Sequence, residues 1–241
     1  MCFPATEDLM TALCSCKQLR EIVLHIQQMS DDALTALVSS LPGITTLQIL
    51  DLSSQYFTST KASEAFANSL GLLNQLQVLK LPQGEGITAT AKSIVHQFWH
   101  LPHLTHLKFA NTLNDDGVLE LASVAKAKAL CRLQKLDLST NLNITDSGWK
   151  DFFLTLDEMK CLQHLTLSTA YTCPLKPHPA TVRAFVQCVS RLPNLVNIHM
   201  LGWLLDEQDF NMFNDMKKYH PQSKRMHVHW QWLLPFQTAI N

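Results

Sequence analysis

A six-residue skeleton, leucine-x-x-leucine-x-leucine with a few apolar replacements, recurs along the chain. Its copies are LREIVL, LQILDL, LQVLKL, LTHLKF, LQKLDL, LQHLTL and LVNIHM, which start at residues 19, 47, 76, 104, 133, 162 and 195. The starts are separated by 28, 29, 28, 29, 29 and 33 residues. Because side chains alternate between the two faces of an extended strand, the fourth and sixth positions of each copy share one face. A nearly fixed period of this length indicates one structural unit that is repeated at least seven times.

Behind each predicted strand, the apolar residues take the three-and-four spacing of a helix with one buried stripe. These stripes begin at Leu34, Ala62, Ala91, Val118, Trp149 and Val182. Three segments offer a capping side chain followed by acidic residues, which suit the positive end of a helix: Ser30-Asp31-Asp32, Asn114-Asp115-Asp116 and Thr145-Asp146-Ser147. The unit is therefore strand, loop, helix, loop, which is the long form of a leucine-rich repeat.

The spacing of stacked units predicts the shape of the whole chain. Parallel strands lie about 4.8 Å apart, whereas packed helices need about 8 to 10 Å, so the stack must curve with its strands inside. We expect an α/β leucine-rich repeat horseshoe solenoid of the ribonuclease-inhibitor-like type, with repeats of about 28 to 29 residues, parallel inner strands and outer helices. The sequence predicts a single domain, 1–241, with a partial N-terminal repeat at 1–18, seven repeats at 19–222, and a C-terminal strand and cap at 223–241.

Both ends of the chain carry patterns of their own. Leu9, Met10 and Leu13 have the spacing of a helix whose strand is absent, which indicates a short isoform, a truncated gene product or a fragment. At the other end, a cap over the open core of the last repeat is expected from Trp230, Trp232, Leu233 and Phe236. The alternative for these aromatic residues is an exposed docking surface.

The composition disfavours several classes of partner. With 19 basic and 20 acidic residues the formal net charge is −1, so neither nucleic acid nor a membrane surface is expected to bind. No apolar run reaches the length of a membrane span, and the first residues, MCFPATEDLM, lack the pattern of a secretion signal. The chain is expected to be cytoplasmic, where its seven cysteines would be reduced thiols.

Motifs that could carry chemistry have simpler explanations. GITATAKS at 86–93 approaches a phosphate-binding loop, but Ala91 replaces the second glycine and belongs to a helix stripe. Two groups of histidines lack the convergence that zinc requires and suit loops and polar strand faces: His100, His103 and His106, and His227 and His229. No nucleophile motif occurs. We expect no enzyme activity, no catalytic residue, no cofactor and no metal.

The residues between the strand leucines would form the concave face of the horseshoe. This face is polar and mixed in charge, as is typical of the surface that a repeat protein presents to a macromolecular partner. The candidate partner-binding residues are His106, Lys108, Gln134, Lys135, Asp137, Gln163, His164 and Thr166. The alternative is a face that is merely solvated.

Several strings outside the repeat consensus resemble a known family. They are LSSQYFTSTKASEAFANSL at 52–70, LNQLQVLKLPQG at 73–84, WLLD at 203–206, HPQSK at 220–224 and LLPF at 233–236. With these strings, nearly the whole chain resembles the carboxy-terminal leucine-rich repeat region of the NLR family apoptosis inhibitory proteins, which are inflammasome receptors.

The resemblance implies a protein-interaction and regulatory module of a cytosolic innate immune receptor. Such a receptor senses bacterial flagellin or secretion-apparatus proteins, supports inflammasome assembly and is linked to apoptosis inhibition. Its implied partners are the adjacent NLR domains, a partner NLR and the bacterial protein. The zinc-binding repeats and the nucleotide-binding module of the family are not found in this chain, so their activities are not transferred to it. The alternatives are a truncated isoform that is dominant-negative or inert, and a nucleotide-dependent switch at 86–93.

Overall fold

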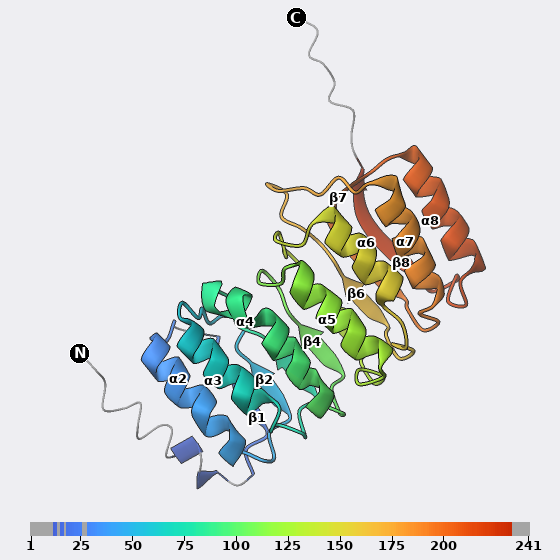
Figure 1. The fold of residues 1–241 in the computed structure, drawn as a ribbon. Helices are drawn as coiled ribbons and strands as arrows, with labels where there is room; N and C mark the ends of the chain where they lie inside the picture. Colours follow the sequence, from blue (N-terminus) through green and yellow to red (C-terminus); the bar gives the residue numbers. More distant parts are fainter. Residues whose placement is uncertain (1–11, 14, 17, 26–27, 233–241) are drawn as a thin grey trace, which may run out of the picture.

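The computed structural model describes residues 12–13, 15–16, 18–25 and 28–232. Eight parallel strands form one sheet, and their order across the sheet is their order in the sequence. The strands are β1 (Glu21–Val23), β2 (Ile49–Asp51), β3 (Val78–Lys80), β4 (His106–Lys108), β5 (Lys135–Asp137), β6 (His164–Thr166), β7 (Asn197–Leu205) and β8 (His227–Trp232). Figure 1 shows the units stacked from blue to red along the molecule. Each predicted repeat therefore contributes one strand to a continuous sheet.

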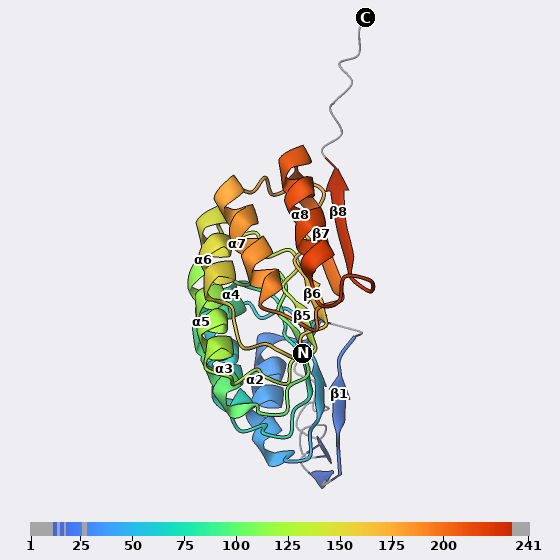
Figure 2. The ribbon, with the colours of Figure 1, turned by 90° about the vertical axis from the view of Figure 1, so that its right-hand side faces the viewer.

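A helix follows each strand from β1 to β7. The helices are α2 (Asp31–Ser40), α3 (Thr60–Leu70), α4 (Glu85–His96), α5 (Asp115–Lys126), α6 (Asp146–Thr155), α7 (Pro179–Ser190) and α8 (Glu207–Tyr219), with short 3₁₀ turns η1 (Leu41–Gly43) and η2 (Gln97–His100). Figure 2 shows the helices along one side and the strands along the other. The predicted α/β leucine-rich repeat architecture, with inner parallel strands and outer helices, is confirmed. Within the described residues, no helix has the length and apolar character to cross a membrane.

The predicted helix starts are confirmed at three positions. Ser30, Asn114 and Thr145 each accept, through their side chains, a hydrogen bond from the backbone amide three residues further on. These amides have no partner within their own helix, so the caps satisfy donors that would otherwise depend on water. The start of each helix is thus fixed locally by a residue that the sequence identifies.

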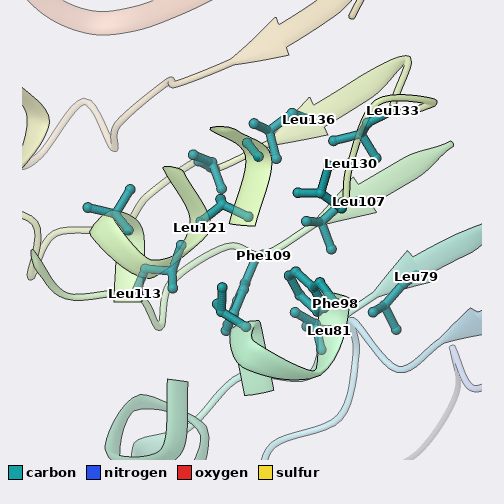
Figure 3. Packing of buried hydrophobic residues seen from close by; sticks show 14 of the residues in the cluster. Leu79, Leu81, Phe98, Leu107, Phe109, Leu113, Leu121, Leu130, Leu133 and Leu136 are labelled. Atoms are coloured by element: carbon teal, nitrogen blue, oxygen red, sulfur yellow. The ribbon is translucent and has the colours of Figure 1, made fainter. Parts of the chain in front are cut away.

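The core lies between the sheet and the helices. The middle residues of β2 to β6 are in register and at most 2% exposed: Leu50, Leu79, Leu107, Leu136 and Leu165. Figure 3 shows Leu107, Phe98 of η2 and Leu121 of α5 directed into the same interior. Each leucine packs on its equivalents in the neighbouring strands, so a single repeat could not bury its own core.

A buried amide joins two neighbouring repeats where β4 and β5 end. Asn141 is 4% exposed and accepts hydrogen bonds from the backbone amides of Thr112 and Leu113, both at 2.8 Å. Its side-chain nitrogen donates to the carbonyls of Phe109, at 2.8 Å, and Leu138, at 2.9 Å. All four bonds that an asparagine side chain can make are therefore used to connect one repeat to the next.

Acidic residues at the helix starts form a second set of connections. Asp115 accepts from the backbone amide of Thr145 at 2.8 Å and from its hydroxyl at 2.7 Å. Asp146 accepts from the backbone amide of His178 and the hydroxyl of Thr181, both at 2.9 Å. The first-turn acids that the sequence assigns to the helix dipole thus also bind the following repeat.

The stack becomes irregular at its 33-residue interval. Residues 167–178 link β6 to α7, and β7 extends over nine residues with a bulge between Met200 and Leu204. Gly202 in this bulge has φ +81°, and a Cβ there would lie 2.4 Å from Oγ1 of Thr169. Both the backbone conformation and the close approach require glycine at this position.

Aromatic side chains fill the core beside the irregular interval. Trp203 is 1% exposed, its ring lies 5.8 Å from that of Trp149 and 6.2 Å from that of Phe153, and its Nε1 donates to the carbonyl of Leu167 at 2.7 Å. The aromatic core continues to the last described strand, where the half-buried Trp230 packs on Phe213 with ring centroids 5.6 Å apart.

Parts of the predictions about the chain ends fall on residues that the structure does not describe. Leu9 and Met10 of the predicted partial repeat lie outside the described residues. Leu13 lies partly buried against the core. Of the predicted cap, Leu233, Phe236 and the side chain of Trp232 also lie outside them. Among the four predicted cap residues, Trp230 is therefore the one whose side-chain packing the structure describes.

Candidate partner-binding face

Two rows of side chains run along the strand side of the molecule. The first row consists of the first residue of each strand: Glu21, Ile49, Val78, His106, Lys135, His164, Asn197 and His227. The second row consists of the third residues: Val23, Asp51, Lys80, Lys108, Asp137, Thr166, His199 and His229. The buried middle residues separate the rows, because adjacent residues of a strand point to opposite faces.

The candidate residues lie together in the middle of this face. His106, Lys135 and His164 are consecutive in the first row, and Lys108, Asp137 and Thr166 are consecutive in the second row. Gln134 and Gln163 precede β5 and β6 and are exposed. The structure thus brings the candidates together across neighbouring strands, and their binding of a partner stays a prediction.

An ion pair between a half-exposed lysine and a buried aspartate occupies the second row between β2 and β3. Nζ of Lys80 lies 2.7 Å from Oδ2 of Asp51, which is 2% exposed and also accepts from the hydroxyl and the backbone amide of Ser53. Burial acts to raise the pKa of Asp51, but the hydrogen bonds from Lys80 and Ser53 outweigh it and lower this pKa. The ammonium group of Lys80 is therefore already paired within the chain.

The next two lysines lack such a partner among the described residues. Within the described residues, neither Lys108 nor Lys135 lies within ion-pair distance of a carboxylate. Asp137, the cross-strand neighbour of Lys108, accepts instead from the backbone amide and hydroxyl of Ser139. The centre of the face therefore presents cationic groups that are available to a partner.

Histidines of both rows continue this surface toward β8. Burial lowers the pKa values of His106, His164 and His199, and Lys135 lowers those of His106 and His164 further. The rings of His199 and His229 are stacked, with centroids 4.6 Å apart. The sequence alone predicts only a polar strand face for His227 and His229. Placing every repeat in one register would have shown that they extend the same two rows.

The first row also contains two side chains that the polar pattern missed. Ile49 and Val78 are half-buried and give the face an apolar section on β2 and β3. They occupy the same repeat position as His106 and Lys135, so the register could have found them.

The remaining sequence motifs lie elsewhere. Residues 86–93 form part of α4, in which Ala91 is 1% exposed and the hydroxyl of Thr90 donates to the carbonyl of Gly86. His100 ends η2, and His103 lies 2.9 Å from a guanidinium nitrogen of Arg132. No group of three or more His, Cys, Asp or Glu side chains in the described chain could hold a metal ion.

No protein-family model matches the chain. It is 45% identical over 234 residues to mouse "Baculoviral IAP repeat-containing protein 1b" and 44% identical over 235 residues to human "Baculoviral IAP repeat-containing protein 1". Both matches cover 97% of this chain and 16% of the relative. "NLR family CARD domain-containing protein 4" of Xenopus tropicalis is 29% identical over 209 residues, which cover 86% of this chain and 20% of that protein. The chain thus spans about a sixth of the length of the curated relatives that it matches first.

The fold class rests on the strands and helices described above. The match to the solved structure of a Bacteroides fragilis protein covers 96% of this chain and 72% of that protein's chain. Its TM-score of 0.47 at 16% identity is too low to support the fold class. The relatives named above match almost the whole repeat stack at far higher identity. Over almost its whole length the chain is therefore a homologue of one segment of baculoviral IAP repeat-containing protein 1, an NLR family apoptosis inhibitory protein.

Proposed function

We propose that this chain is the protein-interaction and regulatory module of a cytosolic innate immune receptor. That receptor senses bacterial proteins such as flagellin or secretion-apparatus components, supports inflammasome assembly and is linked to apoptosis inhibition. The names of its relatives, with their baculoviral IAP repeats and NLR family membership, support the receptor class. The module acts by binding adjacent NLR domains, a partner NLR or the bacterial protein, and it performs no catalysis.

The continuous two-row face is the observation that carries this proposal. It crosses eight strands without interruption, and its side chains are exposed or half-buried over β4 to β6. Parallel strands place these groups at regular spacing on a rigid sheet, which suits an extended protein surface. Lys108 and Lys135 face outward without an ion-pair partner among the described residues, so a partner could satisfy them.

The test is capture of purified flagellin, a secretion-apparatus protein and a partner NLR by the full chain. One variant carries Lys108→Glu, Lys135→Glu and Asp137→Lys on the two-row face, and is called the concave variant. A matched control carries Lys61→Glu, Lys92→Glu and Glu64→Lys, which makes the same change of net charge at exposed positions of α3 and α4. Circular dichroism first establishes that both variants are folded.

We expect the concave variant to lose capture by at least about tenfold, because charge reversal in an interface is repulsive, and the control to retain it. Equal loss in both variants would contradict a concave binding face. No capture by the unaltered chain would instead favour an inert fragment.

The alternative of a dominant-negative isoform concerns the same surface. Co-expression with a full-length receptor and a bacterial ligand, read as caspase activation, separates the two: a fall in output supports interference, and unchanged output counts against it. The alternative of a nucleotide switch finds no support in the geometry, since residues 86–93 lie within a continuous helix. Equilibrium binding of ATP with magnesium tests it, and saturable binding would reinstate it.

A further inference from the structure

We infer that Lys135, flanked by His106 and His164, forms a subsite for a carboxylate of a protein partner, so that the segment docked against β4 to β6 is acidic. This inference rests on the proposed function and adds the chemistry of the partner. It concerns only the centre of the first row, and the rest of the face can bind by other contacts.

The register places the three side chains next to one another. His106 pairs with Lys135, and Lys135 pairs with His164, across strands that lie about 4.8 Å apart. The described part of the first row contains one carboxylate, Glu21, and it lies on β1, three strands away from β4. A carboxylate placed over Lys135 would therefore meet three nitrogen-bearing side chains and no acidic neighbour in its own row.

Hydrogen bonds fix both imidazole rings through Nδ1. The amide nitrogen of Asn197 donates to Nδ1 of His164 at 3.0 Å, so the proton of neutral His164 is on Nε2. The hydroxyl of Thr105 donates to the carbonyl of Gln77 at 3.0 Å, and its oxygen accepts from Nδ1 of His106 at 2.8 Å. Neutral His164 can thus donate from Nε2 to a partner, whereas His106 can do so only after it gains a proton.

A bound carboxylate is therefore coupled to proton uptake. Burial first, and then the charge of Lys135, lower the pKa values of His106 and His164 in the free protein. An anion over the row opposes this effect and raises both pKa values. The charge of Lys80 on β3 also lowers the pKa of His106, and His199 on β7 lowers that of His164. Lys108 on β4 and Asp137 on β5 lie in the second row of the same strands. Affinity should therefore increase as the pH falls through and below about 6.5.

The observations favour an acidic protein segment over a nucleic acid. Asp137 lies in the second row and would repel a continuous phosphate backbone. Neither row contains a Phe, Tyr or Trp from β1 to β7 on which bases could stack. One lysine between two histidines suits a single carboxylate, which a glutamate or aspartate side chain supplies.

Fluorescence anisotropy with the full chain tests the subsite. The probes are a labelled decapeptide of alternating glutamate and serine, the same peptide with glutamine in place of glutamate, and an oligothymidylate of equal length. We expect the glutamate peptide to bind, to bind more tightly as the pH is lowered from about 7.5 to about 5.5, and to lose about fivefold in affinity with Lys135→Gln. The control Lys92→Gln removes the same charge from an exposed position of α4 and should leave the affinity unchanged.

Proton NMR of the histidine rings gives a second readout that a merely structural role would not produce. Saturation with the glutamate peptide should raise the pKa values of His106 and His164 in the unaltered chain and not in Lys135→Gln. Equal affinity of the two variants, tighter binding of oligothymidylate, or no binding of the glutamate peptide would overturn the subsite. If flagellin or an NLR partner is still captured through the concave face in that case, the subsite fails and the proposed interaction module stands.

Discussion

From β2 to β5 leucines recur at equivalent strand positions of the core, with single phenylalanines such as Phe98 and Phe109 beside them. Between α6 and β8, in contrast, a series of contacting aromatic rings runs through the core. In the first region the repeats are 28 or 29 residues apart, and Leu50, Leu79, Leu107 and Leu136 lie in one register. In the second region a 33-residue interval inserts extra chain between β6 and α7. The strand positions keep aliphatic residues across this interval, since Leu165 pairs with Ile198 and Ile198 with Val228, so the change lies in the rest of the core.

The second region keeps the stack continuous in a different way. The larger rings of Trp149, Phe153 and Trp203 occupy the space beside the bulge in β7, and Gly202 permits the turn of the backbone. The indole nitrogen of Trp203 donates to the carbonyl of Leu167, a residue of the segment that follows β6. The Trp203 side chain thus both fills space in the core and satisfies a backbone carbonyl of the extra segment. We therefore expect the stability of the irregular region to depend on fewer side chains than that of the regular region.

Removal of Trp203 should give the largest effect. Trp203→Ala leaves a cavity among aromatic rings and an unsatisfied carbonyl, so we expect a loss of about 3 to 5 kcal/mol in the free energy of unfolding. Urea denaturation measures it. Trp99→Ala is the control, because Trp99 is 44% exposed and its removal should cost far less. Equal losses at the two positions would show that the aromatic core does not hold the irregular region.

Loss of Asn141 should have the next largest effect, and it falls in the regular region. Asn141→Ala leaves the buried amides of Thr112 and Leu113 without an acceptor, so we expect a loss of about 2 to 3 kcal/mol. Asn143→Ala removes a similar side chain from an exposed position and should change stability by less than about 0.5 kcal/mol. If both variants unfold at the same urea concentration, the buried amide does not join the repeats energetically.

A smaller effect is expected from the acids that connect successive helices. Asp115→Ala removes the acceptor of the backbone amide and hydroxyl of Thr145 and should cost about 1 kcal/mol. Asp116→Ala in the same helical turn controls for the helix dipole, because Asp116 is exposed. The same thermal and urea midpoints for both variants would assign the effect of Asp115 to the dipole alone.

The smallest effect is a dependence of stability on pH. His220, in the irregular region, is 4% exposed, accepts from the backbone amide of Gln222 and contacts the carbonyl of Leu192. Burial is the main cause that lowers its pKa, whereas the unfolded chain takes up the proton at about pH 6.5. The unfolded state therefore binds more protons, so stability should be full above about pH 6.5 and fall as the pH decreases through the folded pKa.

Free energies of unfolding measured at several pH values around and below about 6.5 test whether stability falls on acidification. We expect His220→Gln to weaken this dependence of stability on pH. His106→Gln, at a half-buried position of the regular region, should flatten it less. A stability that rises on acidification would contradict both expectations.

Much of the fold could be predicted because its signals are local. The strand skeleton, the helix stripes beginning at Leu34 and Val118, and the caps at Ser30, Asn114 and Thr145 all depend on residues within a few positions of one another. The candidate face followed from the same alternation, which placed His106, Lys135 and His164 on the polar side of their strands. Gln55 shows the limit: it is 1% exposed and accepts from the backbone amide of Met29, a connection that no local pattern indicates.

The sequence by itself determined the period, and with it a stack of parallel strands and outer helices with one polar face. Only the tertiary structure decided which groups on that face are satisfied. Lys80 is paired with Asp51, whereas Lys135 lies between two histidines, although the three lysines of β3 to β5 look alike in the sequence. The physical reason is that neighbours across the sheet are separated by about 28 residues of chain. Their distances and hydrogen bonds are therefore set by the register and burial of whole repeats rather than by local preference.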